Sequence, residues 1–99
     1  MNTARVIFGL LVVAAARASA DTDVQGRALA ATCTGCHGPD GKSVGEIPQL
    51  SGRAQAELAQ LLRDFRDGTR TGTVMPQHAK GYDDAQIDRI AAWFAAQSR

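Results

Sequence analysis

The stretch Cys33-Thr34-Gly35-Cys36-His37 places two cysteines three residues apart and follows them at once with a histidine. On a helical turn, residues three apart lie on the same face, so the two thiols point the same way. Two such thiols can bond to the vinyl groups along one edge of a porphyrin, and C-x-x-C-H is the pattern of c-type haem attachment. His37 can then offer an imidazole nitrogen to the iron. The stretch therefore predicts one haem c, covalently bound through Cys33 and Cys36, with His37 as an axial ligand.

Other uses of two close cysteines are weaker matches to this chain. A redox dithiol of the thioredoxin type is expected in a βαβ setting, and the sequence has no strand pattern. A zinc site needs four ligands, whereas the chain offers only His78 and carboxylates beyond the motif. A structural disulfide would not require His37. A metal-binding or thiol module without haem is the alternative that the motif itself leaves open.

The first 20 residues have the pattern of a cleaved secretory signal peptide. Arg5 precedes an apolar run over residues 6–16, and Ala18-Ser19-Ala20 is an A-x-A cleavage site. The run is too short to span a bilayer, so we expect no membrane insertion after cleavage, although an uncleaved anchor is the alternative. The expected organisation is a signal peptide over 1–20 and one haem-binding domain over 21–99. Export to the periplasm agrees with haem attachment, which takes place outside the bacterial inner membrane.

Charge and size limit the function of the exported domain. Without Arg5 and Arg17 the chain has 9 basic and 10 acidic side chains, a net charge of −1. Near-neutrality argues against nucleic acid as a partner. A domain of 79 residues buries a modest core. A haem would add several hundred Å² of apolar contact, worth on the order of 10 kcal/mol as an upper bound, so we expect it to form part of the core.

Hydrophobic periodicity predicts an all-α fold of three or four helices packed around one haem. In the middle helix Leu58, Leu61, Leu62 and Phe65 form one apolar stripe, and Gly68 is a suitable stop. Asp83 followed by Gln86 is a capping-box pattern at the start of the last helix. Helices are expected over residues 21–32, 53–67 and 83–98, and irregular segments over 38–52 and 69–81.

The second axial ligand is expected to be Met75. It is the one methionine besides Met1, and Pro76 disfavours helical geometry at the preceding residue, which suits a ligand presented from a loop. A thioether and an imidazole together raise the reduction potential, whereas two histidines would lower it. His78, three residues after Met75, is the competing ligand.

Several stretches of the exported domain match a known family pattern. The chain resembles the class I c-type cytochromes, small monohaem electron carriers of the bacterial periplasm. Within that class it is most similar to one domain of the bacterial dihaem cytochromes and to the cytochrome subunit of flavocytochrome c sulfide dehydrogenase. The closer likeness is carried by residues 65–68, 74–75 and 79–82. The matching stretches are residues 26–32, 33–43, 47–52, 75–76 and 90–94.

The resemblance implies roles for residues that the motif alone does not reach. The carbonyl of Pro48 would accept a hydrogen bond from His37 Nδ1, which orients the ligand and tunes its basicity. Leu50, in the same apolar segment, would bury against the haem. The first and last helices would cross, with Gly26 and Ala30 opposite Phe94. One C-x-x-C-H means that haem-to-haem transfer within the chain is absent.

The expected function is one-electron transfer, with both axial positions filled and no site for a substrate, so the protein would not be an enzyme. One candidate role is the haem subunit that takes electrons from a flavoprotein sulfide dehydrogenase. The alternative is a haem protein with an open or labile distal site, such as a small peroxidase or a gas sensor. A set of basic side chains would either line a docking rim or be ordinary solvated charges: Arg63, Arg66, Arg70 and Lys80.

Overall fold

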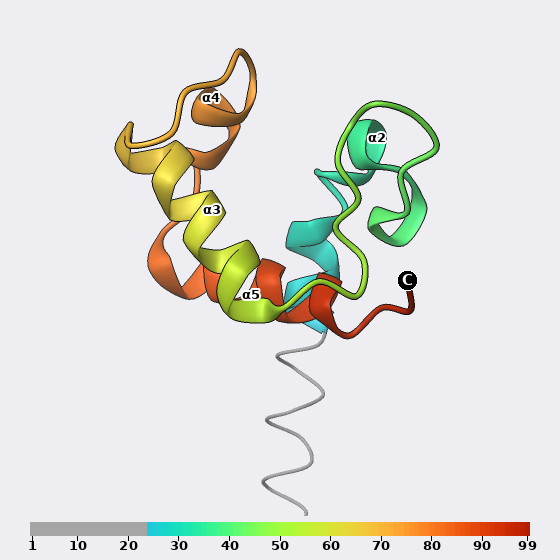
Figure 1. Ribbon diagram of the computed structural model, residues 1–99. Helices are drawn as coiled ribbons and strands as arrows, with labels where there is room; N and C mark the ends of the chain where they lie inside the picture. Colours follow the sequence, from blue (N-terminus) through green and yellow to red (C-terminus); the bar gives the residue numbers. More distant parts are fainter. Residues whose placement is uncertain (1–23) are drawn as a thin grey trace, which may run out of the picture.

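The computed structural model describes residues 24–99, and this part of the chain is helical with no strand (Figure 1). The expected signal peptide over 1–20, and residues 21–23 of the expected first helix, lie outside the described residues. The first helix covers residues 24–30. The later elements are α2 (Thr34–His37), the 3₁₀ turn η1 (Pro39–Gly41), α3 (Gln55–Asp67), α4 (Met75–Ala79) and α5 (Asp84–Ala95). The all-α prediction is confirmed.

The two long helices begin and end where local chemistry favours it. α3 ends at Gly68, whose φ of 83° and ψ of 5° lie in the left-handed region that glycine adopts without strain. At the start of α5 the Asp83 side chain accepts a hydrogen bond from the Gln86 amide, and the Gln86 side chain accepts one from the Asp83 amide. This reciprocal pair satisfies two amides that a helix start would otherwise leave unbonded.

The buried core lies where the first helix, α3 and α5 meet. Phe94, Ile87 and Ile90 of α5 are its largest side chains, and Ala30 and Leu58 reach it from the other two helices. In Figure 1, α5 runs along the base of the molecule with α3 beside it and the first helix (cyan) against it. Three helices packed in one layer bury only a small core, which agrees with the short length of the domain.

Gly26 lets the first helix approach α5 closely. A Cβ at this position would lie 3.0 Å from the carbonyl oxygen of Arg89 and 3.4 Å from Cβ of Trp93. The expected crossing of the first and last helices is therefore present, but Gly26 faces Arg89 and Trp93 rather than Phe94. Ala30, one turn later, shares the buried core with Phe94. The observed crossing thus differs from the expected one only in which residues of α5 face Gly26.

Replacing Gly26 by valine should destabilise the protein by about 1–3 kcal/mol, because the added methyl groups press on a backbone oxygen that cannot move aside alone. Thermal unfolding of the holoprotein measures this. Gly45→Ala is the matched control, since a Cβ there meets nothing within 4 Å and should leave the midpoint nearly unchanged. Equal midpoints for the two variants would contradict the close contact.

Helix α4 corrects the sequence-based expectation for residues 69–81. That segment was expected to be irregular throughout, with Pro76 keeping Met75 out of helical geometry, and this is wrong: Met75 is the first residue of α4. Proline is tolerated in the first turn of a helix because its missing N–H would have no partner there. The irregular chain is confined to residues around this single short helix, and the 38–52 segment likewise includes η1.

The elements above the base form two separate arms. α4 packs against α3, whereas α2 packs against η1. Figure 1 shows α4 and α2 on opposite sides above the base formed by α3 and α5. The fold therefore carries the C-x-x-C-H residues on one arm and Met75 on the other.

Candidate functional site

The two cysteines of the motif are free thiols. Cys33 directly precedes α2 and Cys36 lies within it. Cys33 is half-buried and packs against the edge of the core, and Cys36 is exposed. Burial raises the pKa of the Cys33 thiol above its ordinary value. Both thiols are thus available for a covalent bond on the same short helical turn.

His37 is held in one orientation by the loop that follows it. The ring is buried, with 9% of the residue exposed, and its Nδ1 lies 2.7 Å from the carbonyl oxygen of Pro48. A carbonyl only accepts, so Nδ1 carries the proton and donates. The lone pair of a neutral imidazole is then on Nε2, the nitrogen that is free to bind a metal. The hydrogen bond implied by the family resemblance is present.

The loop bearing Pro48 and Leu50 is fixed through Gly41, a residue that the sequence argument did not single out. Gly41 has a φ of 78°, and its carbonyl accepts hydrogen bonds from the amides of Leu50 (2.8 Å) and Ser51 (3.2 Å). A Cβ on Gly41 would lie 2.7 Å from the Phe94 ring. Only glycine fits this contact, which ties the loop to the core and leaves Leu50 packed at the core's edge. The signal was the Pro39-Asp40-Gly41 turn sequence.

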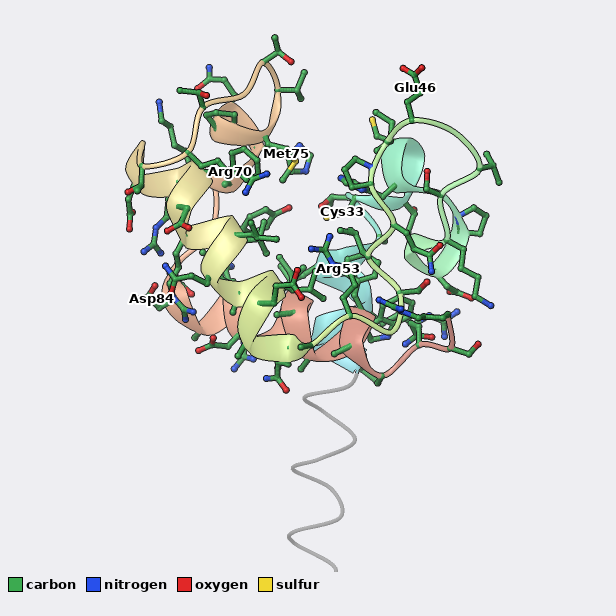
Figure 2. All side chains as sticks on the ribbon, in the orientation of Figure 1. Cys33, Glu46, Arg53, Arg70, Met75 and Asp84 are labelled. Atoms are coloured by element: carbon green, nitrogen blue, oxygen red, sulfur yellow. The ribbon has the colours of Figure 1, made fainter. Side chains whose placement is uncertain are left out.

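Met75 lies on the other arm and faces the motif. Its side chain is half-buried at the start of α4. Figure 2 shows the Met75 side chain directed toward the arm that carries α2, with Cys33 on the inner side of that arm. The structure thus places an imidazole nitrogen and a thioether on two arms that do not pack tightly on each other.

Apolar side chains around the two arms are incompletely covered. Of the predicted stripe on α3, Leu58 is buried, but Leu61, Leu62 and Phe65 remain half-buried. Val44 is 98% exposed and Val74 is 64% exposed, one on each arm. Two thiols on one helical turn, an oriented imidazole and a thioether are the groups that attach and ligate a haem c. The residues present therefore fit a haem.

His78 has partners of its own. Its Nε2 lies 3.5 Å from the Thr32 hydroxyl, and its ring packs at a tilt against Tyr82, with 6.2 Å between ring centroids. Tyr82 in turn is 2.6 Å from the same hydroxyl. Thr32 and Tyr82 are 50 residues apart in the sequence. The sequence analysis did not predict their hydrogen bond, because no local pattern indicates a contact between distant segments.

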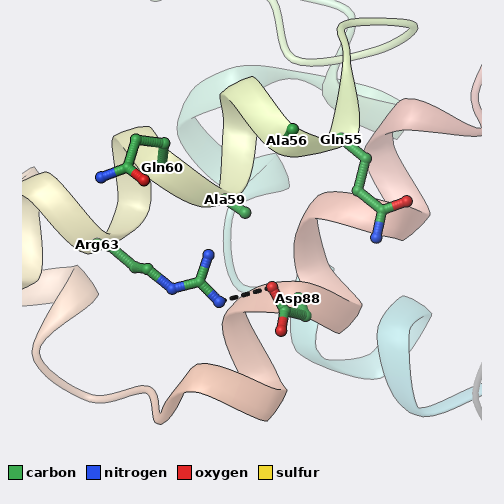
Figure 3. A pocket seen from close by; sticks show the side chains of 6 residues that line it. All are labelled: Gln55, Ala56, Ala59, Gln60, Arg63 and Asp88. Atoms are coloured by element: carbon green, nitrogen blue, oxygen red, sulfur yellow. Dashed lines mark hydrogen bonds and ion pairs between the residues drawn. The ribbon is translucent and has the colours of Figure 1, made fainter.

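Two of the basic side chains considered for a docking rim are instead paired with acids between α3 and α5. Arg63 contacts Asp84 (3.2 Å) and Asp88 (2.7 Å), and Arg66 contacts Asp84 (2.8 Å). Figure 3 shows the Arg63–Asp88 pair in a surface hollow between the two helices. The pKa of Asp84 lies below its ordinary value, mainly because of its hydrogen bond with Arg66 and to a smaller extent because of its hydrogen bond with Arg63.

The stability contributed by Asp84 should depend on pH in a defined direction. Because its pKa is lower in the folded chain than the ordinary 3.8, the stabilisation is complete above pH 3.8 and is lost as pH falls through the folded value. Asp84→Asn should therefore unfold at a lower temperature than wild type at pH 7, and the gap between the two unfolding temperatures should close as the pH falls below 3.8 and Asp84 becomes protonated. Glu46→Gln, at an exposed residue without an ion pair among residues 24–99, is the control. A gap that is constant with pH would contradict the assignment.

Residues 24–99 contain neither a membrane-spanning helix nor a cluster of charged or sulfur side chains suited to a metal ion. Every helix in this part of the chain is too short or too polar to span a bilayer. Nor do three or more histidine, cysteine, aspartate or glutamate side chains gather there as a group that could hold a metal ion.

Comparison with known proteins agrees with a helical fold that carries a haem-attachment turn. Residues 21–94 match the family described as cytochrome c oxidase, cbb3-type, subunit III. The chain is 42% identical to the cytochrome subunit of sulfide dehydrogenase of Chlorobaculum tepidum, over 79% of this chain and 71% of that protein. The chain belongs to the c-type cytochromes of this family.

Two further relatives are longer than this chain. It is 38% identical to cytochrome c4 of Pseudomonas aeruginosa over 73% of its own length and 36% of the relative. It is also 38% identical to the thiosulfate dehydrogenase electron acceptor of Thiomonas intermedia, over 66% of its own length and 32% of that protein. The chain thus spans about a third of each. Its relatives are electron carriers or electron-transfer subunits, and electron transfer rather than catalysis is the function of this chain.

Proposed function

We propose that the protein is a periplasmic one-electron carrier with a single haem c, attached through Cys33 and Cys36 and ligated by His37 and Met75. Residues 1–20 are the cleaved signal peptide and residues 21–99 form the cytochrome domain. The observation that carries the proposal is the buried His37 ring, whose Nδ1 is bound to Pro48 so that Nε2 is left for iron. The position of Met75 on the facing arm supports it.

A haem held by these residues would supply a centre that takes up and releases one electron. The chain's own residues keep the site unchanged while this happens. Pro48 fixes the His37 ring, Met75 would offer a soft thioether that favours the reduced state, and Leu50 and Leu62, which pack at the edge of the core, would keep water from the ring. Two fixed ligands leave no position for a substrate, which suits a carrier.

Replacing Met75 by alanine should leave the haem attached but open its second axial position and lower the reduction potential. The readouts are the weak long-wavelength absorption band of iron–methionine ligation in the oxidised protein, and a redox titration. His78→Ala is the matched control and should retain the band and nearly the wild-type potential. Loss of the band in His78→Ala, or its retention in Met75→Ala, would contradict Met75 as the ligand.

The alternative of an open or labile distal site makes a different prediction for the unaltered protein. A small peroxidase or gas sensor would bind carbon monoxide when reduced, or azide when oxidised, at neutral pH. The proposed carrier should bind neither appreciably until Met75 is removed.

A flavoprotein that oxidises sulfide is the partner that the relatives favour. The Chlorobaculum protein is named as the cytochrome subunit of a sulfide dehydrogenase, and the Thiomonas protein as the electron acceptor of a thiosulfate dehydrogenase. We propose that this chain likewise accepts electrons from such a sulfur-oxidising dehydrogenase, with a flavoprotein sulfide dehydrogenase as the first candidate.

Purification of the holoprotein from its native host should therefore recover a larger, flavin-containing subunit that reduces the haem when sulfide is added. Thiosulfate is the second substrate to add. The partner is contradicted if the protein is recovered as a flavin-free monomer, and if neither sulfide nor thiosulfate reduces its haem in a fresh extract. The carrier function would stand in that case.

A further inference from the structure

The hydroxyl of Thr32 is the point where the two arms are hydrogen-bonded to each other. Among the described residues, the hydrogen bonds between the motif side (residues 24–50) and the Met75 side (residues 55–82) all end on this one oxygen. The Tyr82 hydroxyl lies 2.6 Å from it, and His78 Nε2 lies at the longer distance of 3.5 Å. No ion pair joins these two segments within residues 24–99.

The direction of the short hydrogen bond follows from what the Thr32 hydroxyl already does. Its single proton is directed to the Leu29 carbonyl, 2.9 Å away. A hydroxyl has one donor and two acceptor positions, so Thr32 accepts from Tyr82 and the Tyr82 hydroxyl donates. Both ends are anchored: Thr32 is next to Cys33, and the Tyr82 amide donates to the Ala79 carbonyl at the end of α4.

We propose that the Thr32–Tyr82 hydrogen bond is a latch that holds α4, and with it Met75, closed over the haem face. The inference rests on the proposed function, in which Met75 is the second ligand. Tyr82 and Thr32 are positioning residues in this account, because they act on the site through Met75 and Cys33 and do not touch the iron.

The construction of the Met75 arm explains why one hydrogen bond matters. α4 has five residues, too few to be stable alone, and it is held mainly by packing on α3. Thr32, in contrast, is beside a cysteine that the covalent bond to haem would fix in place. The latch ties the movable arm to this fixed point. Swinging the Met75 arm away from the haem therefore requires breaking the Tyr82 contact.

Imidazole binding to the oxidised holoprotein tests the latch, because imidazole can bind the iron only when Met75 has left. Its apparent affinity is proportional to the fraction of open molecules. Tyr82→Phe keeps the ring and removes the hydroxyl, and Thr32→Val keeps the shape and removes the acceptor. Each should raise the open population, and so the imidazole affinity, about fivefold. The double variant should bind imidazole no more tightly than either single variant. Thr32→Ser keeps the hydroxyl and should retain the wild-type imidazole affinity.

Ser98→Ala is the matched control, since it removes a hydroxyl that bonds Lys42 elsewhere on the surface, and it should leave imidazole binding unchanged. A second readout is amide hydrogen exchange at residues 78–82, which should quicken in Tyr82→Phe but not in Ser98→Ala. If Tyr82→Phe and Thr32→Val only lower the unfolding temperature, with imidazole affinity as in wild type, the latch is overturned.

Failure of the latch is distinguishable from failure of the proposed ligand. A wild-type protein that has the iron–methionine band, but whose imidazole affinity does not respond to Tyr82→Phe, contradicts the latch alone. A wild-type protein without the band contradicts Met75 ligation and the latch together.

Discussion

The hydrogen bond from His37 Nδ1 to the Pro48 carbonyl is the contact on which the site depends. It turns a flexible imidazole at the end of α2 into a ligand with one free nitrogen in one direction. It works only because the loop is itself fixed, through the Gly41 carbonyl that binds the Leu50 and Ser51 amides and through the contact of Gly41 with Phe94. The position of His37 therefore depends on the core of α5 through three contacts: Phe94 with Gly41, Gly41 with the loop that bears Pro48, and Pro48 with His37.

The molecule consists of a tightly packed base and two loosely connected arms. The first helix, α3 and α5 make a small base whose packing is tight enough to require glycine at position 26. The two arms above it meet in few contacts, and much of their apolar surface is half-buried. A cofactor placed between the arms would supply the missing part of the core. Binding of haem and stability of the fold are then linked, because whatever binds the folded chain alone stabilises it.

Much of this could be predicted from the sequence because it rests on local patterns. The stripe on α3, the Gly68 stop and the Asp83–Gln86 capping box each involve neighbours within a few turns, and each is present. Pro76 misled, because a proline that disfavours helix at the preceding residue is also well suited to a helix start. The Thr32–Tyr82 bond and the ion pairs of Arg63 and Arg66 join distant segments, and composition or periodicity carries no signal for such contacts.

One haem, bound covalently within an exported domain, is the proposed functional form of the protein. The intact mass of the denatured protein, purified after expression with the bacterial haem-attachment machinery, tests it most directly. The account predicts the mass of residues 21–99 plus one haem, and a haem colour that stays with the chain through acid–acetone extraction. A mass without haem, a haem lost on extraction, or two reducible free thiols at Cys33 and Cys36 would contradict it.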